Sequence, residues 1–162
     1  MEGIGDEDSV EFSLVRLCES NDDLTEGVER FSLNVPARSL GGVYRASDHL
    51  QRVSILNKEY VKFGLTGLFG IMVLDPESGR VLQVGKKMDE TILVNTSLER
   101  FNECIRIFVS LHPLCSGESD DDWERAAEDL DRAVLRIDAE AHAVNGGFWH
   151  DLKWDIANGD YS

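Results

Sequence analysis

The sequence has few cysteines, few basic residues and no long apolar run. Its three cysteines, Cys18, Cys104 and Cys115, form an odd and widely spaced set, which favours reduced thiols in a cytoplasm over a disulfide framework. No apolar stretch approaches the roughly 20 residues of a membrane span, and the acidic start is not a secretory signal. Lys and Arg number 16 against 31 Asp and Glu, a net charge of −15. We therefore expect no binding to nucleic acid or membranes, and attraction to a basic partner.

The 162 residues, 42% of them apolar, suffice for one domain with a buried core. We expect residues 1–9 to be a flexible acidic N-terminus and residues 10–162 to form the single domain. The charge is uneven: residues 1–30 carry a net −8, residues 31–116 a net +2, and residues 117–140 a net −7. We expect most of the sheet in the nearly neutral centre.

The clearest local pattern is a three-stranded meander. Residues 68–74 are rich in strand formers, residues 75–79 contain the Asp, Pro and Gly of a turn, and residues 81–84 return as the partner strand. Residues 91–94 make the third strand. The glycine-rich residues 64–70 lack the spacing of a phosphate-binding loop, so we interpret them as a turn that enters the first strand.

Apolar residues at helical spacing predict three helices after the meander. The first begins with a capping box formed by Thr96 and Glu99 and ends near His112, before a proline. The second is capped by Ser119 or Asp120 and has an apolar stripe, and the third covers residues 148–156. The apolar stripe of the second helix consists of Trp123, Ala126, Ala127, Leu130, Val134 and Ile137.

The first third of the chain is less distinct. Leu24, Val28 and Phe31 would share one face of a helix within residues 22–31. Residues 41–45 resemble the start of a strand, and a second short strand or a helical turn is expected within residues 50–56.

No motif of catalysis or metal binding is well formed. His112, Cys115 and Cys104 would supply three zinc ligands, but Cys104 lies on the apolar side of a predicted helix, where a free cysteine acts as a small hydrophobe. Residues 120–122 lack the alternating ligands and the late Glu of a calcium loop. There is no nucleophile elbow, and the four histidines form no familiar catalytic arrangement. We therefore expect no enzymatic activity, no cofactor and no metal site.

The acidic run around residue 121 has two interpretations. It is either the solvated start of a helix, where the helix dipole favours carboxylates, or a contact surface for a cationic partner. The candidate partner-binding residues are Asp120, Asp121, Asp122 and Glu124, with Asp22 and Asp23 as a second pair.

Four stretches of the sequence follow the motif order of a known family. Residues 49–56 begin with His-Leu and end with Leu, and residues 75–81 read DPESGRV. Residues 94–101 read VNTSLERF, and residues 148–159 begin with Phe-Trp and end with Gly. These stretches resemble the "LR.L", "DP.TG.V", "VN.SL..F" and "FW…L…I..G" motifs of the fourth family of the SUKH superfamily. The resemblance covers roughly residues 24–160.

The resemblance implies an α+β fold: a curved, mainly antiparallel sheet with flanking N- and C-terminal helices. Most members resemble bacterial immunity proteins that bind a cognate polymorphic toxin domain, often a nuclease or a nucleic-acid deaminase. The expected function is therefore a cytoplasmic immunity protein that neutralises its toxin by direct protein–protein contact. The alternative is a scaffold or regulatory interaction module of the same fold. An acidic surface suits the first function, because a toxin that degrades nucleic acid presents a basic cleft.

Overall fold

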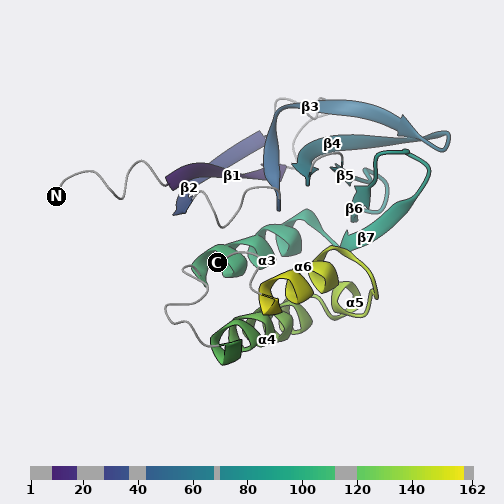
Figure 1. The fold of residues 1–162 in the computed structure, drawn as a ribbon. Coiled ribbons are helices and arrows are strands. Elements are labelled where there is room, and N and C mark those ends of the chain that lie inside the picture. Colours follow the sequence, from purple (N-terminus) through teal and green to yellow (C-terminus); the bar gives the residue numbers. More distant parts are fainter. Residues whose placement is uncertain (1–8, 18–27, 37–42, 68–69, 112–119, 159–162) are drawn as a thin grey trace.

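A computed structural model describes residues 9–17, 28–36, 43–67, 70–111 and 120–158 of the chain. Within these ranges the chain forms a two-stranded sheet, a five-stranded sheet and a group of helices (Figure 1). The strands are β1 (Ser9–Leu17), β2 (Val28–Pro36), β3 (Arg45–Ile55), β4 (Lys58–Thr66), β5 (Gly70–Leu74), β6 (Val81–Val84) and β7 (Thr91–Asn95). The helices are α3 (Leu98–Ser110), α4 (Asp120–Ile137), α5 (Ala139–His142) and α6 (Phe148–Ala157).

The larger sheet is an antiparallel meander in which each strand pairs with the next, in the order β3-β4-β5-β6-β7. Register shifts interrupt the β3–β4, β4–β5 and β6–β7 ladders. Such irregularities bend a strand and increase its twist, which accounts for the curvature of the sheet (Figure 1). The predicted α+β fold with a curved antiparallel sheet is confirmed. All helices of the described residues follow the strands in the chain, so the expected flanking N-terminal helix is not found among them.

The predicted meander is formed by β5, β6 and β7. The turn between β5 and β6 has the expected chemistry, because Gly79 has a positive φ of 76° and its N–H donates to the Asp75 carbonyl at 2.8 Å. Leu68 and Phe69, placed in the first strand by the sequence, lie outside the described residues. The local sequence pattern was therefore sufficient for this part of the sheet.

The glycine-rich stretch before the meander was only partly interpreted correctly. Gly67 does occupy a turn, with φ 55°, but Gly64 lies inside β4. A side chain at position 64 would collide with the Tyr44 ring, whose nearest atom lies 2.3 Å from the position of a Cβ. Gly64 is thus required by the close approach of an aromatic ring from outside the strand. Residue 45 and residues 50–55, expected in separate short elements, belong to the single strand β3, and Leu56 lies in the turn that follows it.

The helix predicted within residues 22–31 is wrong for residues 28–31, which begin β2. Apolar residues alternate at positions 31, 33 and 35, and this period of two matches a strand better than a helix. Cα partners of these three positions are Leu14, Phe12 and Val10 of β1. Residues 22–27 and 1–8 lie outside the described residues, and Ser9, expected in the flexible terminus, begins β1.

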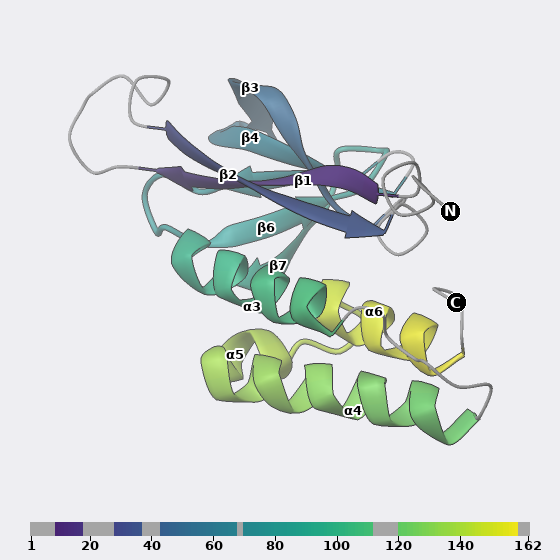
Figure 2. The same ribbon diagram turned by 90° about the vertical axis from the view of Figure 1, so that its left-hand side faces the viewer.

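The helices lie on one side of the sheet in two layers (Figure 2). Helices α3 and α6 are next to the strands, and α4 is farther out. The apolar stripe predicted for α4 is confirmed, since Ala126, Ala127, Leu130 and Val134 are buried. The predicted third helix is α6, while the short helix α5 was not expected.

The predicted capping box of α3 is wrong by one residue. Ser97 is the N-cap, and its side chain accepts a hydrogen bond from the Arg100 backbone N–H at 3.1 Å. The hydroxyl of Thr96 instead contacts the carboxylate of Asp138, between α4 and α5, as described below. A long-range partner has therefore replaced a local one. The predicted end of this helix at His112 and the Ser119 cap of α4 lie outside the described residues.

Candidate partner-binding surface

The acidic residues predicted as a partner contact lie at the start of α4, on the helix farthest from the sheet (Figure 2). Asp121 and Glu124 are exposed, and Asp122 is half-buried. Asp120 is the first residue of the helix. Asp121 and Asp122 also interact within the chain. The structure therefore brings this cluster together on an accessible helix.

Two sets of candidate residues are not placed. Asp22 and Asp23 lie outside the described residues, and so do His112 and Cys115 of the rejected zinc site. Among the residues that are described, no group of three or more His, Cys, Asp or Glu side chains is arranged to hold a metal ion.

Negative charge is concentrated in the helical part of the molecule. Residues 120–158 carry eleven acidic against four basic residues, whereas residues 43–111 carry eight acidic against nine basic residues. The positive end of the α4 dipole stabilises carboxylates in its first turn by about 0.3–1 kcal/mol each. Both interpretations of the acidic run remain compatible with this position, since carboxylates at a helix start favour the helix and those of Asp121 and Glu124 are exposed.

Two of the four family-like motifs, residues 94–101 and residues 148–159, meet in a buried polar network. Asn95, at the end of β7, is fully buried, and its amide nitrogen donates to Asp138 Oδ2 at 3.0 Å. The indole N–H of Trp149, from α6, donates to the amide oxygen of Asn95 at 2.9 Å. Asp138 lies between α4 and α5 and is 2% exposed. The network therefore joins β7, the α4–α5 junction and α6.

Thr96 completes this network from the β7–α3 junction. Its backbone N–H donates to Asp138 Oδ2 at 2.8 Å, and its hydroxyl lies 3.2 Å from both carboxylate oxygens. The guanidinium of Arg100 donates to that hydroxyl at 2.7 Å. The carboxylate of Asp138 also accepts from the Ala141 N–H at 3.4 Å and so caps α5. Asp138 and Asn95 are buried, whereas Thr96 is half-buried. The side chain of Arg100 is exposed. The network therefore holds the fold together and reaches the surface at Arg100.

Sequence reasoning missed Asp138. It is one of many acids in its region, and its partners lie 42 and 43 residues away in the chain. The one available signal was the spacing of Asp138 before Ala141, which resembles a helix cap.

Cys104 of α3 is a fully buried cysteine. Burial raises the pKa of its thiol to about 12, although a hydrogen bond from Asn95 at 3.7 Å favours the thiolate. Because the thiolate is the reactive form, a buried cysteine with this pKa is inert at neutral pH. The prediction that Cys104 acts as a small buried hydrophobe is confirmed.

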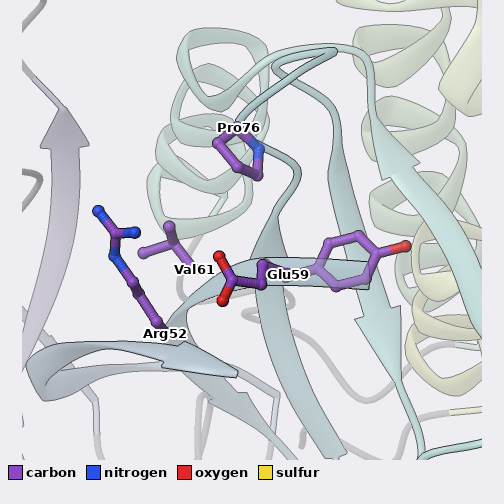
Figure 3. Close-up of a pocket in the computed structure, with 5 residues that line it drawn as sticks. Arg52, Glu59, Val61 and Pro76 are labelled. Atoms are coloured by element: carbon purple, nitrogen blue, oxygen red, sulfur yellow. The ribbon is translucent and has the colours of Figure 1, made fainter. Parts of the chain in front are cut away.

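A small pocket opens beside the β3–β4 hairpin (Figure 3). It is lined by Arg52 of β3, by Glu59, Tyr60 and Val61 of β4, and by Pro76 of the β5–β6 turn. Its volume is about 80 Å³. Ligand pockets commonly measure about 300–1,000 Å³, so this hollow is too small to enclose a substrate.

The turn beside this pocket contains a carboxylate with a perturbed pKa. The side chain of Asp75 accepts hydrogen bonds from Lys58 and Ser78, both at 2.8 Å, and from the Glu77 N–H at 3.0 Å. Burial alone would raise the pKa of Asp75, but these hydrogen bonds outweigh it and lower the pKa to about 2. The charged carboxylate therefore stabilises the β5–β6 turn and its contact with β4.

We expect Asp75→Asn to reduce the free energy of unfolding by about 1–2 kcal/mol at pH 7, a value reduced for the solvent around Lys58. Because the folded-state pKa is depressed, the stabilisation is complete above about pH 4 and is lost as the pH falls towards 2. Urea unfolding of both proteins at several pH values measures this difference. A gap between wild type and variant that stays constant down to pH 2 would contradict the assignment.

Together, the curved antiparallel sheet, its helical backing and an exposed acidic helix define an α+β domain. The buried network, moreover, joins two of the four sequence stretches that resemble the SUKH motifs, residues 94–101 and residues 148–159. The chain belongs to the SUKH-4 immunity protein family, whose family model matches residues 34–155.

The family recognised from the sequence motifs is thus confirmed over most of the chain. No curated protein and no solved structure matches the chain significantly. In the part of the chain that the structure describes, none of the helices has both the length and the apolar character needed to cross a membrane.

Proposed function

We propose that the chain is a cytoplasmic bacterial immunity protein that binds a cognate polymorphic toxin domain and neutralises it without catalysis. The match to the SUKH-4 immunity protein family over residues 34–155 is the observation that carries this proposal. The structure supports it in a second way. Its motif residues maintain the fold, and its helical layer offers an acidic exterior to a partner.

The charge of the protein favours a basic toxin, such as a nuclease or a nucleic-acid deaminase. A toxin of this class needs a positively charged cleft for its substrate, and the acidic helical layer is complementary to such a cleft. The outward acids of α4, led by Asp121 and Glu124, are the proposed contact, and Asp120, Asp122, Asp22 and Asp23 remain candidates beside them.

Co-expression tests the function directly. A bacterial host that produces the toxin domain encoded beside this gene should survive only when the chain is also produced, and the two purified proteins should form a complex. A catalytically inactive toxin domain allows the affinity to be measured by calorimetry. Lack of both protection and a complex would leave the interaction-module alternative as the better assignment.

We expect the double substitution Asp121→Lys and Glu124→Lys to weaken the complex at least about tenfold at low salt, because each reversal replaces attraction by repulsion. The difference should shrink in 0.5 M salt, where screening is effective within about 3–5 Å. The matched control is Asp89→Lys with Glu90→Lys, which reverses two exposed acids of the β6–β7 turn. Equal binding by both double variants would show that the α4 acids serve the helix alone.

A further inference from the structure

Trp154 is an exposed aromatic residue on the outer face of α6. It is 56% exposed, and the other exposed large apolar side chains among the described residues are Leu56, Met88 and Leu135. The opposite face of α6 carries the residues that pack into the core, and Phe148, Trp149, Leu152 and Ile156 are all buried. Helix geometry therefore directs Trp154 away from the core. Packing of the fold does not account for an indole at this position.

The indole of Trp154 is held in a defined orientation. Its Nε1–H donates to Nε2 of His150, one turn earlier, at 3.3 Å. The two rings meet edge to face, with centroids 6.3 Å apart and an interplanar angle of 73°. Its polar atom is thus satisfied within the helix, while the apolar ring remains exposed. An ordered side chain of this kind loses little conformational entropy when a partner binds.

The surroundings of the indole are acidic. Asp151 lies one turn before Trp154, and its side chain is 69% exposed. Helix α6 runs beside α4 (Figures 1 and 2), so both belong to the region of eleven acidic and four basic residues. An aromatic face next to carboxylates attracts the guanidinium of Arg or the ammonium of Lys through cation–π and ionic contacts. Tryptophan is also among the residues that contribute most to protein–protein affinity.

We propose that Trp154, oriented by His150 and flanked by Asp151, anchors a cationic side chain of a basic partner protein. This inference rests on the proposed function, since it assigns to the toxin domain an Arg or Lys that docks on the indole. It also extends the contact from the start of α4 to the outer face of α6. His150 is a positioning residue, because it acts on the partner through Trp154.

The first test is Trp154→Ala, measured by calorimetry against the inactive toxin domain. The affinity should fall at least about thirtyfold, as expected for an interface hot spot. The thermal midpoint should stay close to that of wild type, because the side chain is exposed. Leu56→Ala is the matched control, since it removes an even more exposed apolar side chain (66%) from the tip of the β3–β4 hairpin. This control should bind like wild type.

The second test asks whether His150 orients Trp154 through its hydrogen bond or only packs against the indole. His150→Gln keeps a hydrogen-bond acceptor for the indole and should retain most of the affinity, whereas His150→Leu removes it and should lose about three- to tenfold. Quenching of tryptophan fluorescence by acrylamide reports the change. Trp154 should be protected from the quencher in the complex and more mobile in the free His150→Leu protein.

The outcomes are distinguishable. If wild type binds no neighbouring toxin domain, the proposed function fails and this inference fails with it. If wild type binds and Trp154→Ala binds equally well, only the anchor is overturned. If ultracentrifugation shows a dimer that Trp154→Ala dissociates, the indole contacts a second copy of the chain, and the proposed partner is wrong.

Discussion

Replacing Asp138 by alanine should lower the free energy of unfolding by about 3–5 kcal/mol. The carboxylate is 2% exposed and accepts hydrogen bonds from the Asn95 amide and from the backbone N–H groups of Thr96 and Ala141. Its removal leaves these donors enclosed without an acceptor, and each such group costs about 1–3 kcal/mol. For a chain of this length the thermal midpoint should fall by about 10 °C, measurable by calorimetry.

Asp138→Asn is the matched control for this prediction. It preserves the size of the side chain and one carbonyl acceptor, so it should destabilise less than alanine. The exposed substitution Leu135→Ala, close by on α4, should change stability by less than about 0.5 kcal/mol. If Asp138→Ala and Asp138→Asn both lowered the free energy of unfolding only slightly, the network would not be a stabilising element of the fold.

Phe101→Ala should lower the free energy of unfolding by at least as much, about 3–5 kcal/mol. The Phe101 ring is fully buried, and its centroid lies 5.1 Å from that of Tyr44 and 5.6 Å from that of Phe63. It also lies 6.4 Å from the ring of Trp149. One side chain of α3 therefore joins the sheet to α6, and alanine would leave a cavity at this junction. Denaturant unfolding followed by circular dichroism measures the loss.

Phe101→Leu provides the comparison, because leucine fills part of the cavity but loses the edge-to-face ring contacts. We expect Phe101→Leu to lower the free energy of unfolding by roughly half as much as Phe101→Ala does. A small effect of alanine at this position would mean that the helices pack on the sheet independently of the aromatic cluster.

These two predictions concern side chains that residues of the family-like motifs contact. Asn95 and Thr96 belong to the strand-to-helix motif and Trp149 to the closing helix motif, and all three converge on the network around Asp138 or on Phe101. Because these groups are enclosed or occupied within the fold, family members can retain them for stability. On the function proposed above, recognition of a particular partner would depend on exposed side chains at positions that the motifs do not specify. Trp154 and the α4 acids occupy such positions.

Local elements were predictable where the chain carried its own signal. The β5–β6 turn needs only Asp75, Pro76 and Gly79, which are close in sequence. The apolar stripes of α4 and α6 repeat at helical spacing and proved to be their buried faces. In the N-terminal part the same kind of reasoning failed. Val28 and Phe31 are compatible with one face of a helix. The segment forms strand β2 instead, because it pairs with β1.

The candidate site was predictable only in part. Net charge and its distribution indicated the acidic start of α4, since composition needs no knowledge of contacts. Trp154 was not singled out, because the helical pattern placed Trp149, Leu152 and Ile156 on one face and left Trp154 off it without assigning it a role. Its exposure depends on which face of α6 packs against the rest of the molecule.

By itself, the sequence determined the family, the meander, the three longer helices and the acidic character of the protein. These features arise from neighbouring residues or from composition. Only the tertiary structure decided that Gly64 makes room for Tyr44, that Asp138 joins Asn95 to Ala141, and that Trp154 faces outward. The physical reason is that hydrogen bonds, ring contacts and burial depend on which distant segments meet. Local backbone preferences do not specify which distant segments of the chain come into contact.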